Sequence, residues 1–324
     1  MRRSLVNLAE PRQSCPRSVN RAVSLVAGWR AVARGARRVL AAAVLLAASA
    51  TGQPALAYEA SLHQEIMFIA ARQYNQCVKG TPERMVDALQ VRYAARAARA
   101  QANRNFFRRM FRWGYYEREQ QKPKRTLWVV ETRLHEHFNS LVKTVESNEK
   151  LSEQFSAAGR LAAYVQDVTS PAQAVPIYTA RFWRFNTNDR FNHFDLRAEV
   201  VEAQLIGLCD KILGTDQTYQ DILRSAANAT LQAVEQPIPG MPTTWEAFWR
   251  LAKDPADFGD YGIAGNRFGA RTSFRCGEER CVLLKDDPLY VEFADRQHVV
   301  AVIGTMRVLN RLQTNRMDLA AADG

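Results

Sequence analysis

A candidate cleavage site after Ala57 divides this chain into a leader and a part that folds. An apolar run from Leu40 to Ala50 follows a segment that carries Arg30, Arg34, Arg37 and Arg38. The small residues of Ala55-Leu56-Ala57 then give the form that signal peptidase cuts. Residues 1–57 are therefore predicted to be a cleaved signal peptide, with Tyr58 as the new N-terminus. The protein is expected to be secreted or periplasmic.

Two other interpretations of the leader stay open. The apolar run could be a membrane anchor, but it spans eleven residues, whereas a helix needs roughly 20 residues to cross a bilayer. Gly52 and Pro54 also follow the run closely. Alternatively, Arg37-Arg38 could mark a twin-arginine signal, which is another address for export.

The charge of the chain is unevenly distributed. The formal net charge is +11, of which the leader contributes +8, so residues 58–324 carry only +3. Overall basicity therefore gives no argument for nucleic-acid binding. The segment 92–125 nevertheless holds eleven Arg or Lys residues and two Glu. Such asymmetry often marks a contact surface for phosphate or anionic lipid. We expect a single domain over residues 58–324 with a basic insertion at 92–125.

Four cysteines lie beyond the leader, and an even number is typical of an oxidising compartment. Cys276 and Cys281 are close in sequence and are expected to close a local loop. Cys77 and Cys209 would then pair and tie the first helix to a later one. The other two connectivities and four free thiols are the alternatives.

Hydrophobic periodicity predicts a mainly α fold. Helical patterns cover residues 61–79, 82–112, 126–148, 151–169, 195–209, 216–234 and 288–312. Residues 236–290 are rich in Gly, Pro and Asp, which predicts long loops with one hairpin near Cys276. Because few segments alternate as strands do, we expect a multi-helix bundle with long loops.

Histidine and carboxylate side chains are the candidates for a metal site. The histidines are His63, His135, His137, His193 and His298. Asp167 lies in an apolar helical pattern, where a carboxylate needs a partner or a cation; an ordinary ion pair at the helix end is the alternative. Glu131 and His135 are four residues apart and would share one helix face, although a solvated face has the same pattern. His298 is predicted to be a packing histidine, and His193 either a ligand or a loop hydrogen-bonder.

Four short motifs follow one another along residues 58–324. They are Tyr58-x4-His63, then Ala163-x3-Asp167-x3-Pro171-x-Gln173, then His193 with acids shortly after it, and finally Gly304-x2-Arg307-x2-Asn310. In this order they resemble the zinc-dependent phospholipase C and single-strand-specific nuclease superfamily. Members of that family begin with a tryptophan whose amine and carbonyl bind zinc. They also carry His-x3-Asp-x3-Pro-x-His at a helix end, so both histidines of that motif are replaced in this chain.

The resemblance implies a phospholipase C/nuclease-like bundle and a set of zinc ligands. Tyr58, His63 and Asp167 would form one nearly complete site. Asp167 with His135, or with His137, would form part of a second, and His193 is what is left of a third. The implied cofactor is zinc, at one to three ions per chain, and no organic cofactor is implied.

The expected function is zinc-dependent hydrolysis of a phosphodiester, either a phospholipid headgroup or a single-stranded nucleic acid. Zinc suits this reaction because it ionises a bound water and polarises a phosphoryl oxygen. The replaced histidines favour an alternative, a catalytically degenerate member that acts as an envelope or membrane-binding protein through Arg92–Arg125. Aromatic residues in that segment could enter an anionic membrane, stack on bases or pack inward; nucleic acid is the less favoured partner. A helical envelope protein without any metal is a third hypothesis.

Overall fold

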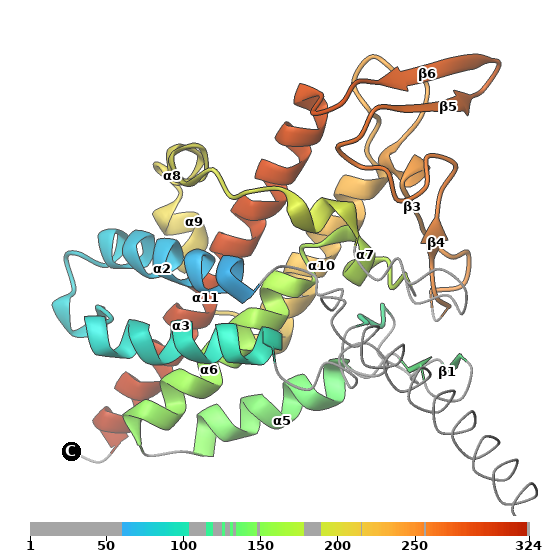
Figure 1. Cartoon of the computed structure of the whole chain (residues 1–324). Coiled ribbons are helices and arrows are strands. Elements are labelled where there is room, and N and C mark those ends of the chain that lie inside the picture. The colour runs from blue at the N-terminus through green and yellow to red at the C-terminus, as the bar shows by residue number, and fades with distance from the viewer. Residues whose placement is uncertain are drawn as a thin grey trace, which may run out of the picture. The chain divides into compact units, whose positions relative to one another are not determined.

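The computed structural model describes residues 60–103, 115–118, 125–126, 130–131, 134–147, 150–177, 189–214, 216–255 and 257–322. This part of the chain is mainly α, as predicted (Figure 1). The helices are α2 (Ala60–Cys77), α3 (Ala88–Asn103), α5 (Leu134–Ser147), α6 (Leu151–Asp167), α7 (Pro171–Ala174), α8 (Ala198–Leu205), α9 (Cys209–Leu213), α10 (Tyr219–Glu235) and α11 (Pro288–Ala322). Short 3₁₀ turns lie at η1 (Pro82–Arg84), η3 (Arg190–His193) and η4 (Trp245–Ala247). The predicted signal peptide lies outside the described residues.

The strands of the described residues form short antiparallel pairs. They are β1 (Arg125–Thr126) with β2 (Val130–Glu131), β3 (Trp249–Arg250) with β4 (Asp260–Tyr261), and β5 (Thr272–Cys276) with β6 (Glu279–Leu283). The β5–β6 pair is the hairpin predicted near Cys276. Its turn contains Gly277, whose φ of +67° is a conformation that favours glycine. No helix in the described ranges is both long and apolar enough to cross a bilayer.

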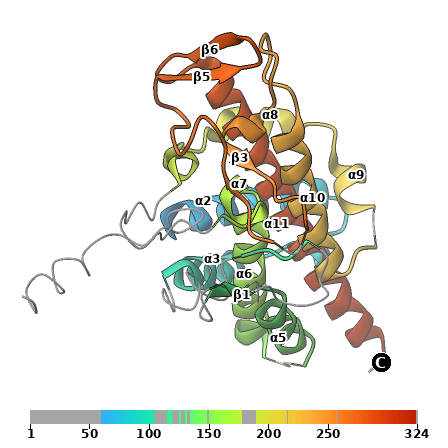
Figure 2. The same ribbon diagram turned by 90° about the vertical axis from the view of Figure 1, so that its right-hand side faces the viewer.

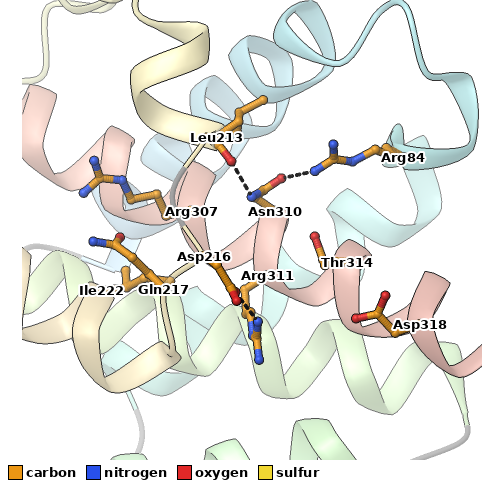
Figure 3. Close-up of a pocket in the computed structure, with 11 residues that line it drawn as sticks. Arg84, Leu213, Asp216, Gln217, Ile222, Arg307, Asn310, Arg311, Thr314 and Asp318 are labelled. Atoms are coloured by element: carbon orange, nitrogen blue, oxygen red, sulfur yellow. Dashed lines mark hydrogen bonds and ion pairs between the residues drawn. The ribbon is translucent and has the colours of Figure 1, made fainter.

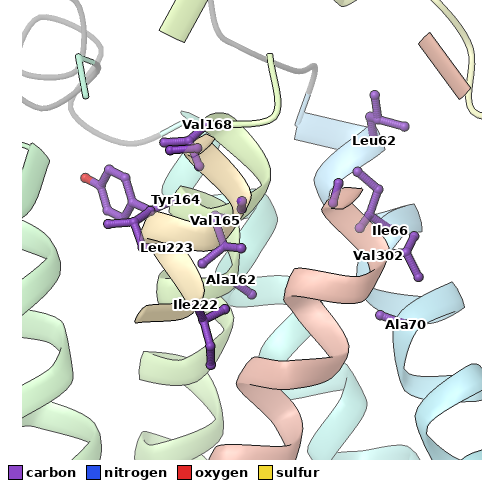
Figure 4. Packing of buried hydrophobic residues seen from close by; sticks show 14 of the residues in the cluster. Leu62, Ile66, Ala70, Ala162, Tyr164, Val165, Val168, Ile222, Leu223 and Val302 are labelled. Atoms are coloured by element: carbon purple, nitrogen blue, oxygen red, sulfur yellow. The ribbon is translucent and has the colours of Figure 1, made fainter. Parts of the chain in front are cut away.

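Helix α6 lies at the centre of the bundle. It packs against α3, α5, α10 and α11 (Figure 2). Every residue from Leu161 to Asp167 is buried. Figure 4 shows this packing, with Val165 of α6 and the following Val168 among side chains of α2, α10 and α11. Because α6 is enclosed on nearly all sides, a polar group on it must find a partner or a cation inside the protein.

Helices α3 and α6 approach each other closely because their interface is built from small residues. A Cβ added at Gly159 would lie 2.2 Å from the carbonyl oxygen of Ala94. Ala95 and Ala98 on α3 and Ala162 on α6 are also buried. Such small side chains let two helix backbones come together with little volume between them.

The predicted helix 82–112 begins later than expected, and this part of the prediction is wrong. Residues 82–84 form the 3₁₀ turn η1, and α3 starts only at Ala88. Two sets of contacts set this start. Asp87 Oδ1 accepts hydrogen bonds from the amide nitrogens of Leu89 and Gln90, as an N-cap residue does. The side chain of Asn75 also bonds both the amide nitrogen and the carbonyl oxygen of Val86, at 2.9 and 2.8 Å. This contact holds the backbone at Val86 outside a helical ladder. Residues 104–112 of the predicted helix lie outside the described residues.

Two other predicted helices also need correction. Helix α5 begins at Leu134 rather than at residue 126, because residues 125–126 and 130–131 pair as strands. Glu131 therefore does not share a helix face with His135. The predicted helix 195–209 is shorter in the structure, where α8 covers Ala198–Leu205. Gly207, whose φ is +76°, then separates α8 from α9, which begins at Cys209.

The segment predicted as long loops contains an aromatic core. Trp249 and Phe293 stack with ring centroids 5.5 Å apart, and Phe268 packs against both rings. Asp189 is buried among them and accepts hydrogen bonds from Trp249 Nε1 at 2.8 Å and the Tyr261 hydroxyl at 3.0 Å. Burial raises the pKa of Asp189, although these donors oppose the shift. The loops of this segment and the short β3–β4 pair are thus fixed by ring packing against α11.

The predicted cysteine pairs are confirmed. Cys77 at the end of α2 is bonded to Cys209 at the start of α9, with a Cα–Cα distance of 5.2 Å. Cys276 and Cys281 link β5 to β6 at a Cα–Cα distance of 5.9 Å. Both distances lie within the usual range for a disulfide. These bonds are typical of an oxidising environment.

Candidate metal centre

His63 and Asp167, two of the residues predicted as zinc ligands, lie together in the structure. His63 is on the first turn of α2, and Asp167 is the last residue of α6. His63 Nε2 is 3.2 Å from Asp167 Oδ1. The side chains are 0% and 2% exposed, respectively. Residues more than a hundred positions apart therefore form one buried polar pair.

A chain of hydrogen bonds orients the ring of His63. Its Nδ1 is 2.6 Å from Gln166 Oε1, and Gln166 Nε2 donates to the hydroxyl oxygen of Thr305 at 3.0 Å. That hydroxyl in turn donates to the carbonyl of Ala301 at 2.8 Å. Because the hydroxyl proton of Thr305 is engaged, its oxygen must accept from Gln166. Gln166 Oε1 therefore faces His63, and Nδ1 must carry a hydrogen.

The hydrogen on Nδ1 also decides what His63 Nε2 presents to Asp167. With the hydrogen on Nδ1, a neutral His63 presents a lone pair at Nε2, directed at a carboxylate oxygen of Asp167. Two acceptors 3.2 Å apart repel each other in a buried site unless a cation lies between them. The cation is either a second ring proton, which makes an ion pair, or a metal ion.

The pair fits the geometry of zinc. Zinc bonds of about 2.0–2.1 Å to nitrogen and oxygen, at tetrahedral angles, place two ligand atoms about 3.3 Å apart. The observed 3.2 Å matches this separation. A zinc-bound histidine also commonly donates its other ring hydrogen to a carbonyl or carboxylate, and Gln166 Oε1 accepts such a bond. The two side chains would supply half of a tetrahedral set.

The other predicted ligands lie elsewhere or outside the described residues. Tyr58 is outside them. His135 Nε2 contacts the carbonyl oxygen of Glu117 at 3.0 Å, and burial lowers the pKa of His135. His193 is exposed and lines a pocket of about 350 Å³ together with Leu62 and Glu65. Within the described part of the chain, no three His, Cys, Asp or Glu side chains come together as a metal site.

The basic insertion has two different parts among the described residues. Arg92, Arg96 and Arg99 are exposed on α3, opposite its buried alanines. Tyr115 and Tyr116 are buried, so these two aromatic residues pack inward and are not available to bases or lipid. Tyr93 on α3 is partly buried and packs against the core. Residues 104–114, which hold the remaining aromatic side chains of this segment, lie outside the described residues.

Gln166 and Thr305, which orient the candidate ligand His63, were not predicted from the sequence. A signal was present, because Gln166 interrupts the apolar stretch of α6 and Thr305 lies among the apolar residues of α11. A polar side chain in a buried helix needs a hydrogen-bond partner. The partner of each is distant in sequence, and the fold was needed to identify it.

Comparison with family models, with curated proteins and with solved structures gives no match to this chain.

Proposed function

We propose that this chain is an exported, zinc-dependent phosphodiester hydrolase whose metal site includes His63 and Asp167. The observation that carries the proposal is the separation of 3.2 Å between His63 Nε2 and Asp167 Oδ1, with Nδ1 held by Gln166. That arrangement calls for a cation and has the spacing of two zinc ligands. The α-amino group and carbonyl of Tyr58 are the further ligands that the motif order implies.

Each residue has a separate role in the proposed site. Asp167 supplies negative charge that balances part of the charge of the ion. Gln166 keeps the Nε2 lone pair of His63 directed toward the metal position, and Thr305 fixes the amide of Gln166. Zinc, when bound, would ionise a water near neutral pH and polarise the phosphoryl oxygen of the substrate.

A pocket lined in part by neighbours of His63 in the sequence is the proposed place for substrate. It is lined by Glu65 on α2 and by Asn192 and His193 on η3. The side chain of Asn192 also accepts a hydrogen bond from Ser170, three residues after Asp167, at 2.9 Å. This contact ties the pocket wall to the end of α6. Substrate is proposed to reach the metal from this side.

A second candidate function is supported by the burial of the pair. Structural zinc sites are closed, whereas catalytic sites keep an open position, and His63 and Asp167 are almost fully buried. The chain would then be a non-catalytic member that contacts an anionic membrane through its basic insertion. The exposed Arg92, Arg96 and Arg99 are the described residues that favour this alternative.

The first experiment measures the N-terminal mass and the zinc content of the exported protein. The precursor is expressed with its leader, and the purified product is compared with the variants Asp167→Asn and Asp210→Asn. Asp210 is an exposed aspartate and serves as the matched control. We expect a Tyr58 start and bound zinc in the parent and in Asp210→Asn, and loss of zinc in Asp167→Asn. A parent that starts at Tyr58 and holds no zinc would refute the metal site.

A second measurement separates the two candidate functions. The zinc-loaded protein is assayed on a chromogenic phosphodiester, with and without a chelator. Hydrolysis that is abolished by the chelator and restored by zinc supports the enzyme. Activity that survives the chelator contradicts the zinc mechanism. Bound zinc without hydrolysis favours the membrane-binding alternative, which is then tested on anionic vesicles with Arg92, Arg96 and Arg99 changed to Ala.

A further inference from the structure

A second pocket, of about 300 Å³, lies between α11 and the segment that joins α9 to α10 (Figure 3). Three arginines line it: Arg84 from η1, and Arg307 and Arg311 from α11. Residues of the candidate metal centre do not line this pocket. The two sites therefore have separate linings, although both use residues of α11.

Two of the three arginines are engaged within the protein. Arg311 Nη1 pairs with Asp216 Oδ1 at 2.7 Å. Arg84 Nη2 donates to Asn310 Oδ1 at 2.6 Å, and Asn310 Nδ2 bonds the carbonyl of Leu213 at 3.4 Å. These contacts, drawn as dashed lines in Figure 3, fix the walls of the pocket.

Arg307 differs from its neighbours. Its side chain is partly buried, and its Nε is buried with no hydrogen-bond partner in the described part of the chain. Burial lowers the pKa of Arg307, and no acidic neighbour opposes the shift. Gln217 Oε1, which lines the same pocket, is likewise buried with no partner among the described residues. In Figure 3 the side chains of Arg307 and Gln217 extend to the same side of the pocket.

A buried guanidinium nitrogen without a partner is costly, because burial removes its hydration and no group in the described part of the chain replaces it. An oxyanion would satisfy the guanidinium with charge-assisted hydrogen bonds. A singly protonated phosphate group would also offer a hydroxyl to Gln217 Oε1. The pocket is about ten times the volume of one water molecule, for which roughly 30 Å³ is usual, so it has room for more than the phosphate itself.

We infer that this pocket binds a small molecule that carries a phosphate monoester, with Arg307 as the main anion contact. The inference does not depend on the proposed hydrolase activity, because it rests on the charge and the unsatisfied groups of the pocket alone. Arg84 and Arg311 add positive potential and keep their own partners. Asp216 and Asp318 also line the pocket, and their carboxylates would repel a ligand that carries several negative charges.

The test is the binding of inorganic phosphate and of glycerol 3-phosphate to metal-free protein at constant ionic strength. Isothermal titration calorimetry gives the affinity for the parent, for Arg307→Gln and for Arg296→Gln. Arg296 is an exposed arginine of the same helix, so its variant has the same change of charge and is the matched control. We expect saturable binding to the parent and to Arg296→Gln, and a loss of at least tenfold in Arg307→Gln. Tighter binding of glycerol 3-phosphate than of phosphate is expected from the volume of the pocket.

Thermal unfolding distinguishes a binding role from a structural one. Without phosphate, Arg307→Gln should be at least as stable as the parent, because it removes an unpaired, partly buried charge. Phosphate should raise the Tm of the parent and leave that of Arg307→Gln unchanged. Absence of saturable binding to the parent, or equal binding by Arg307→Gln, would overturn the inference. A variant that loses stability or fails to fold would overturn it too, because it would show that Arg307 supports the fold.

Discussion

The close approach of α3 and α6 leads to a sharp prediction for Gly159→Ala. The new Cβ would lie 2.2 Å from the carbonyl oxygen of Ala94, whereas an ordinary contact of this kind is at least about 3.4 Å. The helices would have to separate by roughly 1.2 Å, because the obstructing atom belongs to the backbone and cannot rotate away. This separation would also loosen the hydrogen bond of 2.9 Å from Gln101 to the Tyr164 hydroxyl.

The expected loss of stability follows from three contributions. Overpacking at a rigid position costs about 3 kcal/mol, and weakening a buried hydrogen bond adds about 1 kcal/mol. The better helix propensity of alanine offsets about 1 kcal/mol. Gly159→Ala should therefore lower the free energy of unfolding by about 3 kcal/mol, measured by urea denaturation.

The matched control is Gly80→Ala. A Cβ at Gly80 would meet no atom within 4 Å, so the free energy of unfolding should change by less than about 1 kcal/mol. If Gly159→Ala proved as stable as the parent, the reasoning would fail, because the two helices would not be in backbone contact.

Three further predictions concern the metal site, the disulfides and a buried histidine. Gln166→Leu should weaken zinc binding about 10- to 100-fold, because His63 loses the acceptor that orients it; competition with a coloured chelator measures this. Removing the Cys77–Cys209 bond, which closes a loop of 132 residues, should lower the free energy of unfolding by about 5 kcal/mol. Removing the Cys276–Cys281 bond should lower it by about 2 kcal/mol. Burial lowers the pKa of His298 from 6.5 to about 4, so its neutral form is the one that the fold favours. Neutral His298 therefore contributes fully to the free energy of unfolding above pH 6.5. As the pH falls toward 4, this free energy should decrease by about 3 kcal/mol.

Each of these has an outcome that would contradict it. Unchanged zinc affinity in Gln166→Leu would mean that the amide does not orient the ligand. Equal losses from the two disulfide deletions would contradict the dependence on loop length. For the histidine, urea denaturation of His298→Leu is compared with the parent at pH 7 and pH 4.5. A variant that loses as much stability as the parent between these pH values would show that another group is responsible.

Local patterns predicted much of the fold. Helix α6, the β5–β6 hairpin and both disulfides were expected from periodicity, turn residues and cysteine spacing. The start of α3 had a local signal, because Asp87 with Gln90 three residues later is a capping pattern. The bonds between the side chain of Asn75 and the backbone of Val86 have no such local signal. The aromatic core around Trp249 was missed for a related reason. Phe268 comes from a loop and Trp249 from the two-residue strand β3, which are too short or irregular for a periodic pattern to mark these rings as buried.

The candidate site was predicted in part. His63 and Asp167 were singled out by their place in an ordered set of motifs, and the structure brings them together. Spacing alone could not have paired them, because the two residues meet only through the packing of α2 on α6. Gln166 and Arg307 could not be predicted from local pattern either. The role of Gln166 depends on its distant partners His63 and Thr305. The role of Arg307 depends on the lack of a partner for its Nε among the described residues.

The disulfide pattern has a consequence for the order of folding. Cys77 is bonded to the next cysteine along the chain, and Cys276 to the one after it. A polypeptide that emerges N-terminus first into an oxidising compartment presents each cysteine with its native partner before any competitor appears. Oxidation in order of emergence therefore gives the correct connectivity directly, and no step of disulfide isomerisation is required.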